Sequence, residues 1–179
     1  MQAIGLNHSI ETAVADIVDN SLDAGSEKIL IRFVRDGGRL IGLCVVDDGR
    51  GMDEPTIDRA MTVGGKRHYD NADLGHFGIG LKAASLGQAR VLTVVSRPKA
   101  GRAVGRRWHI ESAASGFECD VLDGDFCASA LDRHWQFLTP QSGTLVMWTE
   151  VKSFPTVSHG NSIDRFVDDT VVRLRQHLG

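Results

Sequence analysis

The hydrophobic positions along the chain predict two amphipathic helices, one near each end. In residues 9–24 apolar side chains recur at spacings of three and four, the period of a helix with one buried face. Ser9 stands where an N-cap is expected, and Gly25 stands where the helix should stop. Residues 162–178 show the same spacing. We therefore expect a helix over each range.

Between these helices the pattern changes to that of β-strands. Residues 28–34 alternate and residues 40–46 are apolar, and the Asp-Gly-Gly turn at 36–38 between them predicts a hairpin. Shorter helices are predicted over 53–61, with Asp53 as cap, and over 79–87. Further strands are predicted at 90–97, 103–110, 117–122 and 143–151. Because no crossover helices separate most of these strands, we predict one α+β domain over residues 1–179, with a mainly antiparallel sheet.

Composition narrows the class of protein. No apolar run reaches the roughly 18 residues of a membrane span, and the N-terminus lacks the pattern of a signal peptide. The three cysteines form no CxxC pair, which indicates reduced thiols in a cytoplasmic protein. The net charge of −3 does not favour direct binding of nucleic acid by this chain. A nucleotide stays possible, since backbone N–H groups can hold phosphates without adding charge.

One polar stripe lies on the first predicted helix. Asp16, Asn20 and Asp23 fall within an arc of about 60°, roughly opposite the apolar face. Such a stripe is usually a solvated surface. The same oxygen-bearing side chains also suit Mg²⁺, and a carboxylate one turn away can deprotonate a water molecule.

A second motif follows the second strand of the hairpin. In DDGRGM (47–52), Asp47 can accept a hydrogen bond from an exocyclic amine of a base. Gly49 and Gly51 let a flat ring approach the backbone, and Met52 can pack on that ring. The alternative is an ordinary tight turn, because Asp-Gly is a common turn pair.

Two glycine-containing segments complete the candidate chemistry. Residues 62–80 form a long loop, of a kind that is usually functional, and its last glycines run into a helix N-terminus. The free N–H groups there favour an anion, although the segment is neither a Walker A loop nor a Rossmann fingerprint. At 142–144, Ser-Gly-Thr enters a strand, where a hydroxyl can reach a ligand or simply belong to a turn.

Taken in order along the chain, these motifs resemble those of the GHKL ATPase superfamily, which includes DNA gyrase, the large heat-shock chaperone, histidine kinases and MutL. The order is an ExxxN-like helix, DxGxG, GxxGxG and Gly-Thr, over residues 11–144. VADIVDNSLDAG and VVDDGRGM are similar to the MutL and MORC branches, and VGGKRHYDNADLGHFGIGLKAAS is most similar to MORC. The resemblance covers nearly the whole chain. It implies a Bergerat-fold, two-layer sandwich with a mixed, mostly antiparallel sheet and helices on one face.

The resemblance also implies a site for ATP and Mg²⁺ and assigns roles by position. Asn20 would coordinate Mg²⁺, and Asp47 would bind the adenine amine with help from Thr144 through a water molecule. The lysines at 66 and 82 would approach phosphates, or else lie in solvent. The residues implied to contact the nucleotide are Asn20, Asp23, Ala24, Asp47, Gly49, Gly51, Met52, Lys66, Gly75, His76, Phe77, Gly78, Ile79, Gly80, Leu81, Lys82 and Thr144.

The chain departs from the family pattern at the catalytic position. The residue four before the Asn is normally Glu, the general base, and here it is Asp16, one methylene shorter. A misplacement of about 1 Å lowers a rate on the order of 100-fold. Asp19 does not replace it, because its side chain is turned by about 60°. The family's transducer domain, with its lysine for the γ-phosphate, has no counterpart here, so we expect an excised domain or a reduced family member. ATP-dependent homodimerisation should be weakened too, because only eight residues precede the first helix.

Three functions compete on these grounds. The first is a slow ATPase that acts as a nucleotide-gated clamp in a larger protein, with Asp16 as base and ADP as product. The second is a module that senses ATP through dimerisation without hydrolysing it. The third is a histidine-kinase catalytic domain, followed by a heat-shock chaperone. The third is ranked lower because residues 1–8 leave no room for a phosphoacceptor hairpin, and the chaperone because the 62–80 segment fits MORC better. The full-length protein would then act on DNA or on protein.

Overall fold

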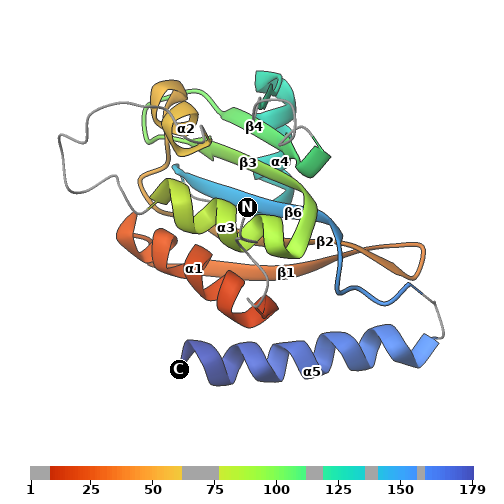
Figure 1. Ribbon diagram of the computed structural model, residues 1–179. Helices are drawn as coiled ribbons and strands as arrows, with labels where there is room; N and C mark the ends of the chain where they lie inside the picture. The colour runs from red at the N-terminus through yellow and green to blue at the C-terminus, as the bar shows by residue number, and fades with distance from the viewer. Residues whose placement is uncertain (1–8, 62–76, 112–118, 136–140, 157–159) are drawn as a thin grey trace, which may run out of the picture.

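A computed structural model describes residues 9–61, 77–111, 119–135, 141–156 and 160–179 (Figure 1). These segments form five helices and six strands. In chain order they are α1 (Ile10–Asp23), β1 (Ile29–Asp36), β2 (Arg39–Asp47), α2 (Glu54–Met61), α3 (Phe77–Gln88), β3 (Ala89–Arg97), β4 (Val104–His109), β5 (Asp120–Val121), α4 (Gly124–His134), β6 (Gly143–Val151) and α5 (Gly160–Leu178).

The strands form one sheet in the order β1-β2-β6-β3-β4-β5. Every described pair in it is antiparallel, which confirms the mainly antiparallel pairing, although the expected mixed sheet would also have had a parallel pair. The reason lies in the connections: short turns join β1 to β2 and β3 to β4, and β6 enters between the two hairpins in the direction opposite to both neighbours. The predicted β1–β2 hairpin is confirmed, with Gly37 and Gly38 both at positive φ.

The sheet buries an apolar layer on each face. On one face Val45, Val94, Val146 and Trp148 pack with the helices α1, α2, α3 and α5, as Figure 1 shows for α1, α3 and α5. This arrangement confirms the predicted α+β sandwich. Among the described segments, every helix is too short or too polar to span a bilayer.

The opposite face carries one helix that the sequence pattern did not predict. Cys127, Leu131 and Trp135 of α4 and its C-cap pack on Cys44 and neighbouring side chains of the central strands. Asp123 caps α4 by accepting hydrogen bonds from two backbone N–H groups at 3.0 Å. The expectation of helices on one face therefore holds for four helices and is wrong for α4. The cysteines are free thiols, as expected, and burial raises the pKa of Cys44 to about 12.

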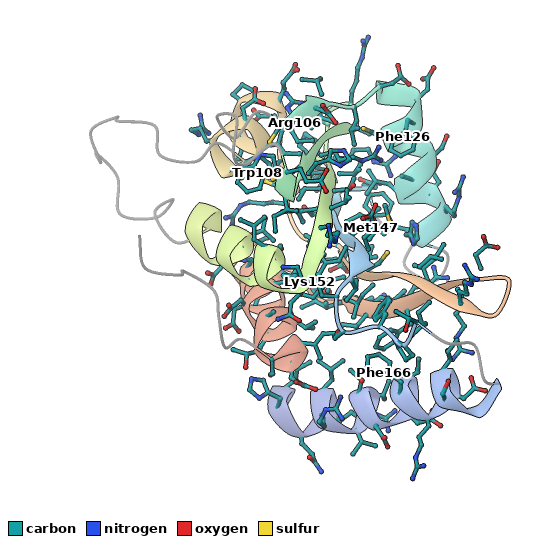
Figure 2. The ribbon with its side chains drawn as sticks, turned by 45° about the vertical axis from the view of Figure 1, so that its right-hand side comes forward. Arg106, Trp108, Phe126, Met147, Lys152 and Phe166 are labelled. Carbon is teal, nitrogen blue, oxygen red and sulfur yellow. The ribbon has the colours of Figure 1, made fainter. Side chains whose placement is uncertain are left out.

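The predicted helix ends are confirmed at two caps. The Ser9 hydroxyl accepts the N–H of Thr12 at 3.3 Å, and the Asp53 carboxylate accepts the N–H of Thr56 at 3.0 Å. The last helix, α5, lies along β1 and α1, where Phe166 contacts the rings of Phe33 and Phe154 (Figure 2). These contacts leave the ends of β2, β6 and β3 next to α1 and α3, and the candidate site lies there.

Candidate functional site

Three buried polar side chains, Asp47, Thr144 and Ser96, lie side by side near the ends of three adjacent strands, and we call them the polar row. Asp47 on β2 pairs with Thr144 on β6, and Thr144 pairs with Ser96 on β3. Because side chains alternate along a strand, all three point to the face that carries Val45, Val146 and Val94 two residues further in. Their exposed fractions are 4%, 5% and 0%. The apolar layer under α1 and α3 thus ends in a polar row.

The Asp47 carboxylate is held by three hydrogen bonds from the protein. Its Oδ1 accepts the N–H of Gly49 at 2.9 Å and that of Thr144 at 3.2 Å. Its Oδ2 accepts the hydroxyl of Ser21 on α1 at 3.0 Å. A carboxylate oxygen has about two acceptor positions, so Oδ1 is filled and Oδ2 keeps one. Among the described residues no other donor bonds to Oδ2, which leaves one buried acceptor available there.

The two neighbouring aspartates have different environments. Burial raises the pKa of Asp47 above its ordinary value, against the lowering effect of its three hydrogen bonds. Burial acts in the same direction on Asp48, but hydrogen bonds from the N–H groups of Lys28 and Glu27 and the Ser26 hydroxyl hold the pKa of Asp48 below its ordinary value. Asp48 thus anchors the start of β1, and Asp47 faces the interior.

The loop after Asp47 is fastened to α1. The N–H of Arg50 bonds to the carbonyl of Ala24 at 3.0 Å, and its guanidinium bonds to the carbonyl of Asp23 at 2.8 Å. A Cβ on Gly49 would come within 2.9 Å of the Ala24 methyl group. Ala24 therefore packs under the loop, and its predicted contact with a nucleotide stays a prediction. Asp23 acts through its backbone carbonyl, and its carboxylate is at the surface.

The same loop is fastened to β3 at its other end. Gly51 has a φ of 68°, and a Cβ there would come within 2.0 Å of the Arg97 carbonyl oxygen. The N–H of Met52 donates to the Ser96 hydroxyl at 2.8 Å, and the Met52 side chain is buried. The loop thus passes close to the polar row because glycine is used where a side chain would collide.

The polar stripe on α1 lies closer to the core than its spacing suggested. Asp16 and Asn20 are half-buried. In contrast, Leu22, one of the apolar side chains that recur at helical spacing in residues 9–24, is 57% exposed. The buried face is centred near Ile17 and Ser21, and Asn20 is turned from Ile17 by only about 60°. The expectation of a stripe opposite the apolar face is therefore wrong. Asn20 and Asp16 lie at the border of the buried face of α1, a helix that packs against both α3 and α5.

Helix α3 begins at Phe77, two residues before its predicted start. Gly78, Ile79 and Gly80 therefore belong to its first turn, where N–H groups have no acceptor within the helix and the dipole favours an anion. Leu81 lies one turn inside the helix, and its side chain is buried. At the other end, the Lys152 ammonium bonds to the Leu86 carbonyl at 2.8 Å (Figure 2).

These features match a known family. The profile described as "Histidine kinase-, DNA gyrase B-, and HSP90-like ATPase" matches residues 8–141. The chain belongs to this family. The DNA mismatch repair protein MutL of Rhodospirillum rubrum is 36% identical to it over 115 residues, which are 59% of this chain and 17% of that protein. The GHKL resemblance is thus confirmed, and the MutL-like branch is supported.

Several predicted contacts of this ATPase family domain lie outside the described residues. Lys66, Gly75 and His76 are among them. The side chains of Phe77, Ile79 and Lys82 are likewise outside the description, although their backbone is helical. Their assignments stay predictions.

The donor groups present fit a magnesium ion. The described residues contain no cluster of three or more His, Cys, Asp or Glu side chains suited to a metal. Mg²⁺ commonly takes one or two protein oxygens and completes its shell with phosphates and water. The half-buried amide of Asn20, on the helix that packs against α3, can supply such an oxygen.

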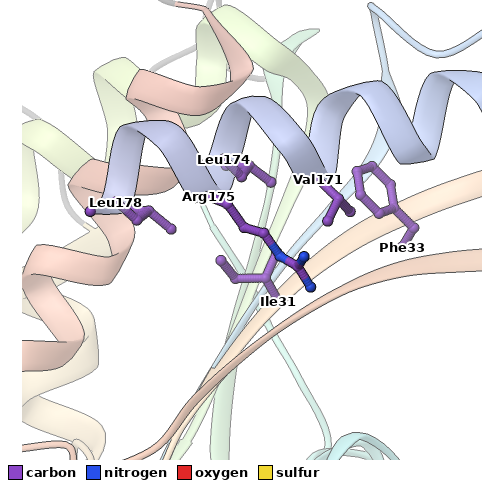
Figure 3. A pocket seen from close by; sticks show the side chains of 7 residues that line it. Ile31, Phe33, Val171, Leu174, Arg175 and Leu178 are labelled. Carbon is purple, nitrogen blue, oxygen red and sulfur yellow. The ribbon is translucent and has the colours of Figure 1, made fainter.

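A pocket at the outer edge of the sheet is a different feature (Figure 3). It has a volume of about 360 Å³ and lies between β1 and α5. Its side chains are Ile31, Phe33, Val171, Leu174, Leu178 and Arg175. None of these side chains carries a hydrogen-bond acceptor and none belongs to the polar row, so the pocket is separate from the polar site.

Two site residues were missed by the motif analysis, Ser21 and Ser96. Both are hydroxyl side chains at inward positions among apolar ones: Ser21 follows Ile17 by one helical turn, and Ser96 follows Leu92 and Val94 on one face of β3. A lone hydroxyl on an otherwise apolar inward face was the available signal. Its meaning depends on Asp47 and Thr144, which are distant in sequence.

Proposed function

We propose that this chain binds ATP together with Mg²⁺, with the base at the polar row and the phosphates at the start of α3. The observation that carries the proposal is the single open acceptor on buried Asp47 Oδ2. An exocyclic amine is the group that satisfies it. Membership of an ATPase family supports the same ligand.

Each neighbouring segment has a part in this binding. Gly49 and Gly51 keep the loop free of side chains at its closest approaches, and Met52 packs against the base. Thr144 assists Asp47 through a water molecule. At the other end, the N–H groups of Gly78, Ile79 and Gly80 hold phosphate oxygens, and Asn20 supplies an oxygen to Mg²⁺. Lys66, Gly75, His76 and Lys82 complete the phosphate contacts.

Calorimetric titration of ATP and Mg²⁺ into the Asp47→Asn variant tests the proposal. The amide keeps Oδ1 as an acceptor for Gly49 and Thr144, and its Nδ2 can donate to Ser21, whose own proton turns to the Ile17 carbonyl at 3.1 Å. The fold should therefore persist while the open acceptor becomes a donor. We expect the affinity for ATP to fall at least about tenfold.

Asp48→Asn is the matched control, because that carboxylate bonds only to residues at the start of β1 in the described structure. It should lower stability and leave the affinity for ATP nearly unchanged. Absence of binding by the parent chain, or equal affinity in the Asp47→Asn variant, contradicts the proposal.

Hydrolysis is the second part of the proposal. Asp16 lies half-buried one turn before Asn20 on α1, which packs against α3, and a carboxylate there can act as the base on a water molecule at the γ-phosphate. Because Asp is one methylene shorter than Glu, we expect slow turnover. The alternative function is a switch that binds ATP and does not hydrolyse it.

Release of ADP from three variants separates these two functions. Loss of clear parental turnover in Asp16→Ala supports the enzyme. Turnover that is absent from the parent and present in Asp16→Glu supports the switch. Asp19→Ala is the control, since Asp19 is exposed and turned away from Asn20, and it should change neither rate.

The chain spans 17% of the length of the MutL protein that it resembles. We infer a MORC-like or MutL-like clamp in which ATP favours a homodimer of the full-length protein. Light scattering with and without a non-hydrolysable ATP analogue tests this role. A full-length protein whose mass does not change with nucleotide contradicts it.

A further inference from the structure

One hydroxyl joins the three segments that surround the polar row. Ser96 is fully buried on β3, and its Oγ lies 2.8 Å from the Met52 nitrogen, 3.0 Å from the Gly143 carbonyl oxygen and 2.9 Å from the Thr144 hydroxyl oxygen. The loop after Asp47, the turn before β6 and the first residues of β6 therefore meet at this side chain.

The bonding capacity of a hydroxyl restricts how these contacts are made. A serine hydroxyl has one proton and two acceptor positions. Ser96 accepts from the Met52 N–H, which has no other role than donor. If its proton goes to the Gly143 carbonyl, its second acceptor position takes the proton of Thr144, and all three contacts are satisfied at once. We take this arrangement as the resting one, because unpaired buried polar groups are unfavourable.

This arrangement fixes what Thr144 offers to a ligand. With its proton directed to Ser96, Thr144 Oγ1 has only acceptor positions left. Asp47 Oδ2, the adjacent group in the row, is also an acceptor. A water molecule that joins these two acceptors donates its two protons to them and turns its own acceptor positions toward the base, where they fit an amino group. They repel a carbonyl oxygen at the same position of a base.

We propose that Ser96 is a specificity-determining positioning residue, which keeps the polar row acceptor-only and so selects a purine with an exocyclic amine over one with a carbonyl group. The inference rests on the proposed binding of ATP at Asp47. Without the Ser96 hydroxyl, the Thr144 proton can turn to the bridging water, which then has a proton free to donate to a carbonyl oxygen of the base. The Met52 N–H also loses its acceptor, which loosens the loop that borders the base.

The test compares ATP with ITP, whose base carries a carbonyl in place of the adenine amine. Calorimetry with Mg²⁺ gives both dissociation constants for the parent chain and for Ser96→Ala. We expect the parent to prefer ATP, and we expect the ratio of the two constants to shrink about tenfold in the variant, through weaker ATP binding and stronger ITP binding. An unchanged ratio in Ser96→Ala overturns the inference.

Ser85→Ala is the matched control. Ser85 is equally buried and accepts the Trp148 indole N–H at 2.8 Å, but it fixes α3 and so acts on the phosphate end, which ATP and ITP share. This variant should lower both affinities alike and keep their ratio. A merely structural role of Ser96 would give the same result as Ser85→Ala.

The remaining outcomes concern a Ser96→Ala variant that does not fold and a failure of the proposed function itself. If Ser96→Ala does not fold, Ser96→Cys fills the same space with a weak donor and acceptor and should shrink the ratio partway; a parental ratio in that variant overturns the inference. If the parent binds neither nucleotide, the proposed function itself is wrong. If the parent binds ATP and the ratio is insensitive to Ser96, only the present inference is wrong.

Discussion

At the scale of single residues, burial and hydrogen bonding give two chemically identical side chains different roles. Asp47 and Asp48 are adjacent, yet burial raises the pKa of Asp47, whereas hydrogen bonds hold the pKa of Asp48 down. Asp48 uses its carboxylate to hold the backbone N–H groups of Glu27 and Lys28 and the hydroxyl of Ser26. Asp47 keeps one acceptor for a ligand. The difference arises from the 180° alternation at the strand end, which turns one side chain inward and the next outward.

Gly51 and Gly25 offer a prediction at the same scale, because both have positive φ but different surroundings. A Cβ on Gly51 would meet the Arg97 carbonyl oxygen at 2.0 Å, and a Cβ on Gly25 would meet nothing within 4 Å. Gly25→Ala should therefore lower the free energy of unfolding by about 1 kcal/mol, the cost of left-handed backbone alone. Gly51→Ala should lower it by about 2 kcal/mol more, through steric overlap.

Urea denaturation of the two variants measures these losses. Gly51→Ala should also weaken ATP binding, since the loop must move away from β3 and carries Met52 with it. Gly25→Ala should leave binding unchanged. Equal losses of stability in the two variants would contradict the collision that the structure describes.

At the scale of elements, the short helix α2 depends on one buried cation. The Arg106 side chain is 4% exposed, and its guanidinium bonds to Asp58 at 2.7 Å, to Glu54 at 3.2 Å and to the Gly105 carbonyl at 2.9 Å (Figure 2). Burial alone would lower the pKa of Arg106, but the two carboxylates raise it. An isolated helix of eight residues is unstable in water, so these bonds and the apolar contacts of Ile57 and Met61 place it.

The two ends of this ion cluster should respond unequally to substitution. Arg106→Met leaves Asp58 and Glu54, whose side chains are 52% and 63% exposed and can be hydrated. The double variant Glu54→Gln, Asp58→Asn leaves a buried guanidinium without a counter-charge. We expect losses of about 1 kcal/mol for the first and about 3 kcal/mol for the second in chemical denaturation. A larger loss for Arg106→Met would show that packing of the arginine stem outweighs its charge.

At the scale of the whole molecule, the sequence pattern predicted what depends on nearby residues. The periodicity of α1 and α5, the β1–β2 hairpin and the cap at Asp53 are local, and the structure confirms them. Helix α4 was missed because its buried side chains, Cys127, Leu131 and Trp135, span only about two helical turns. They are buried only because they pack on the second face of the sheet, which the local pattern does not indicate. The order of the strands, with β6 between β2 and β3, was likewise not local.

The candidate site likewise contains residues that local motifs predicted and residues that only the pairing of distant strands brings together. Asp47, Met52 and Thr144 were found because each belongs to a short motif. The polar row exists only because strand register places residues 47, 144 and 96 side by side. Ser96 sits in a strand that reads as apolar, and no spacing within that strand indicates its partners. Register between distant strands was therefore the missing information.

The attachment of α5 to α1 has a pH dependence that follows from one ion pair. Glu11 is buried on α1, and its carboxylate accepts a hydrogen bond from the Arg173 guanidinium of α5. Burial by itself raises the pKa of Glu11, but Arg173 and the hydrogen bond from Ser9 lower it further than burial raises it. The folded pKa is thus below the unfolded value of about 4.3.

The lowered pKa of Glu11 determines how the free energy of unfolding changes with pH. A depressed folded pKa means that the ionised form stabilises the fold above the unfolded pKa, and that the stabilisation is lost as pH falls through the unfolded value toward the folded one. Glu11→Gln should therefore lower the free energy of unfolding at pH 7 by about 1 kcal/mol. The difference between parent and variant should shrink toward zero as the pH falls below 4.3. Other titrating groups cancel in that difference, since they are common to both proteins.

Asp164→Asn is the control at the other end of α5, where the Arg35–Asp164 pair is 44% and 62% exposed and should contribute little at any pH. A difference for Glu11→Gln that stays constant or grows on acidification would mean that the ion pair does not hold α5 to α1.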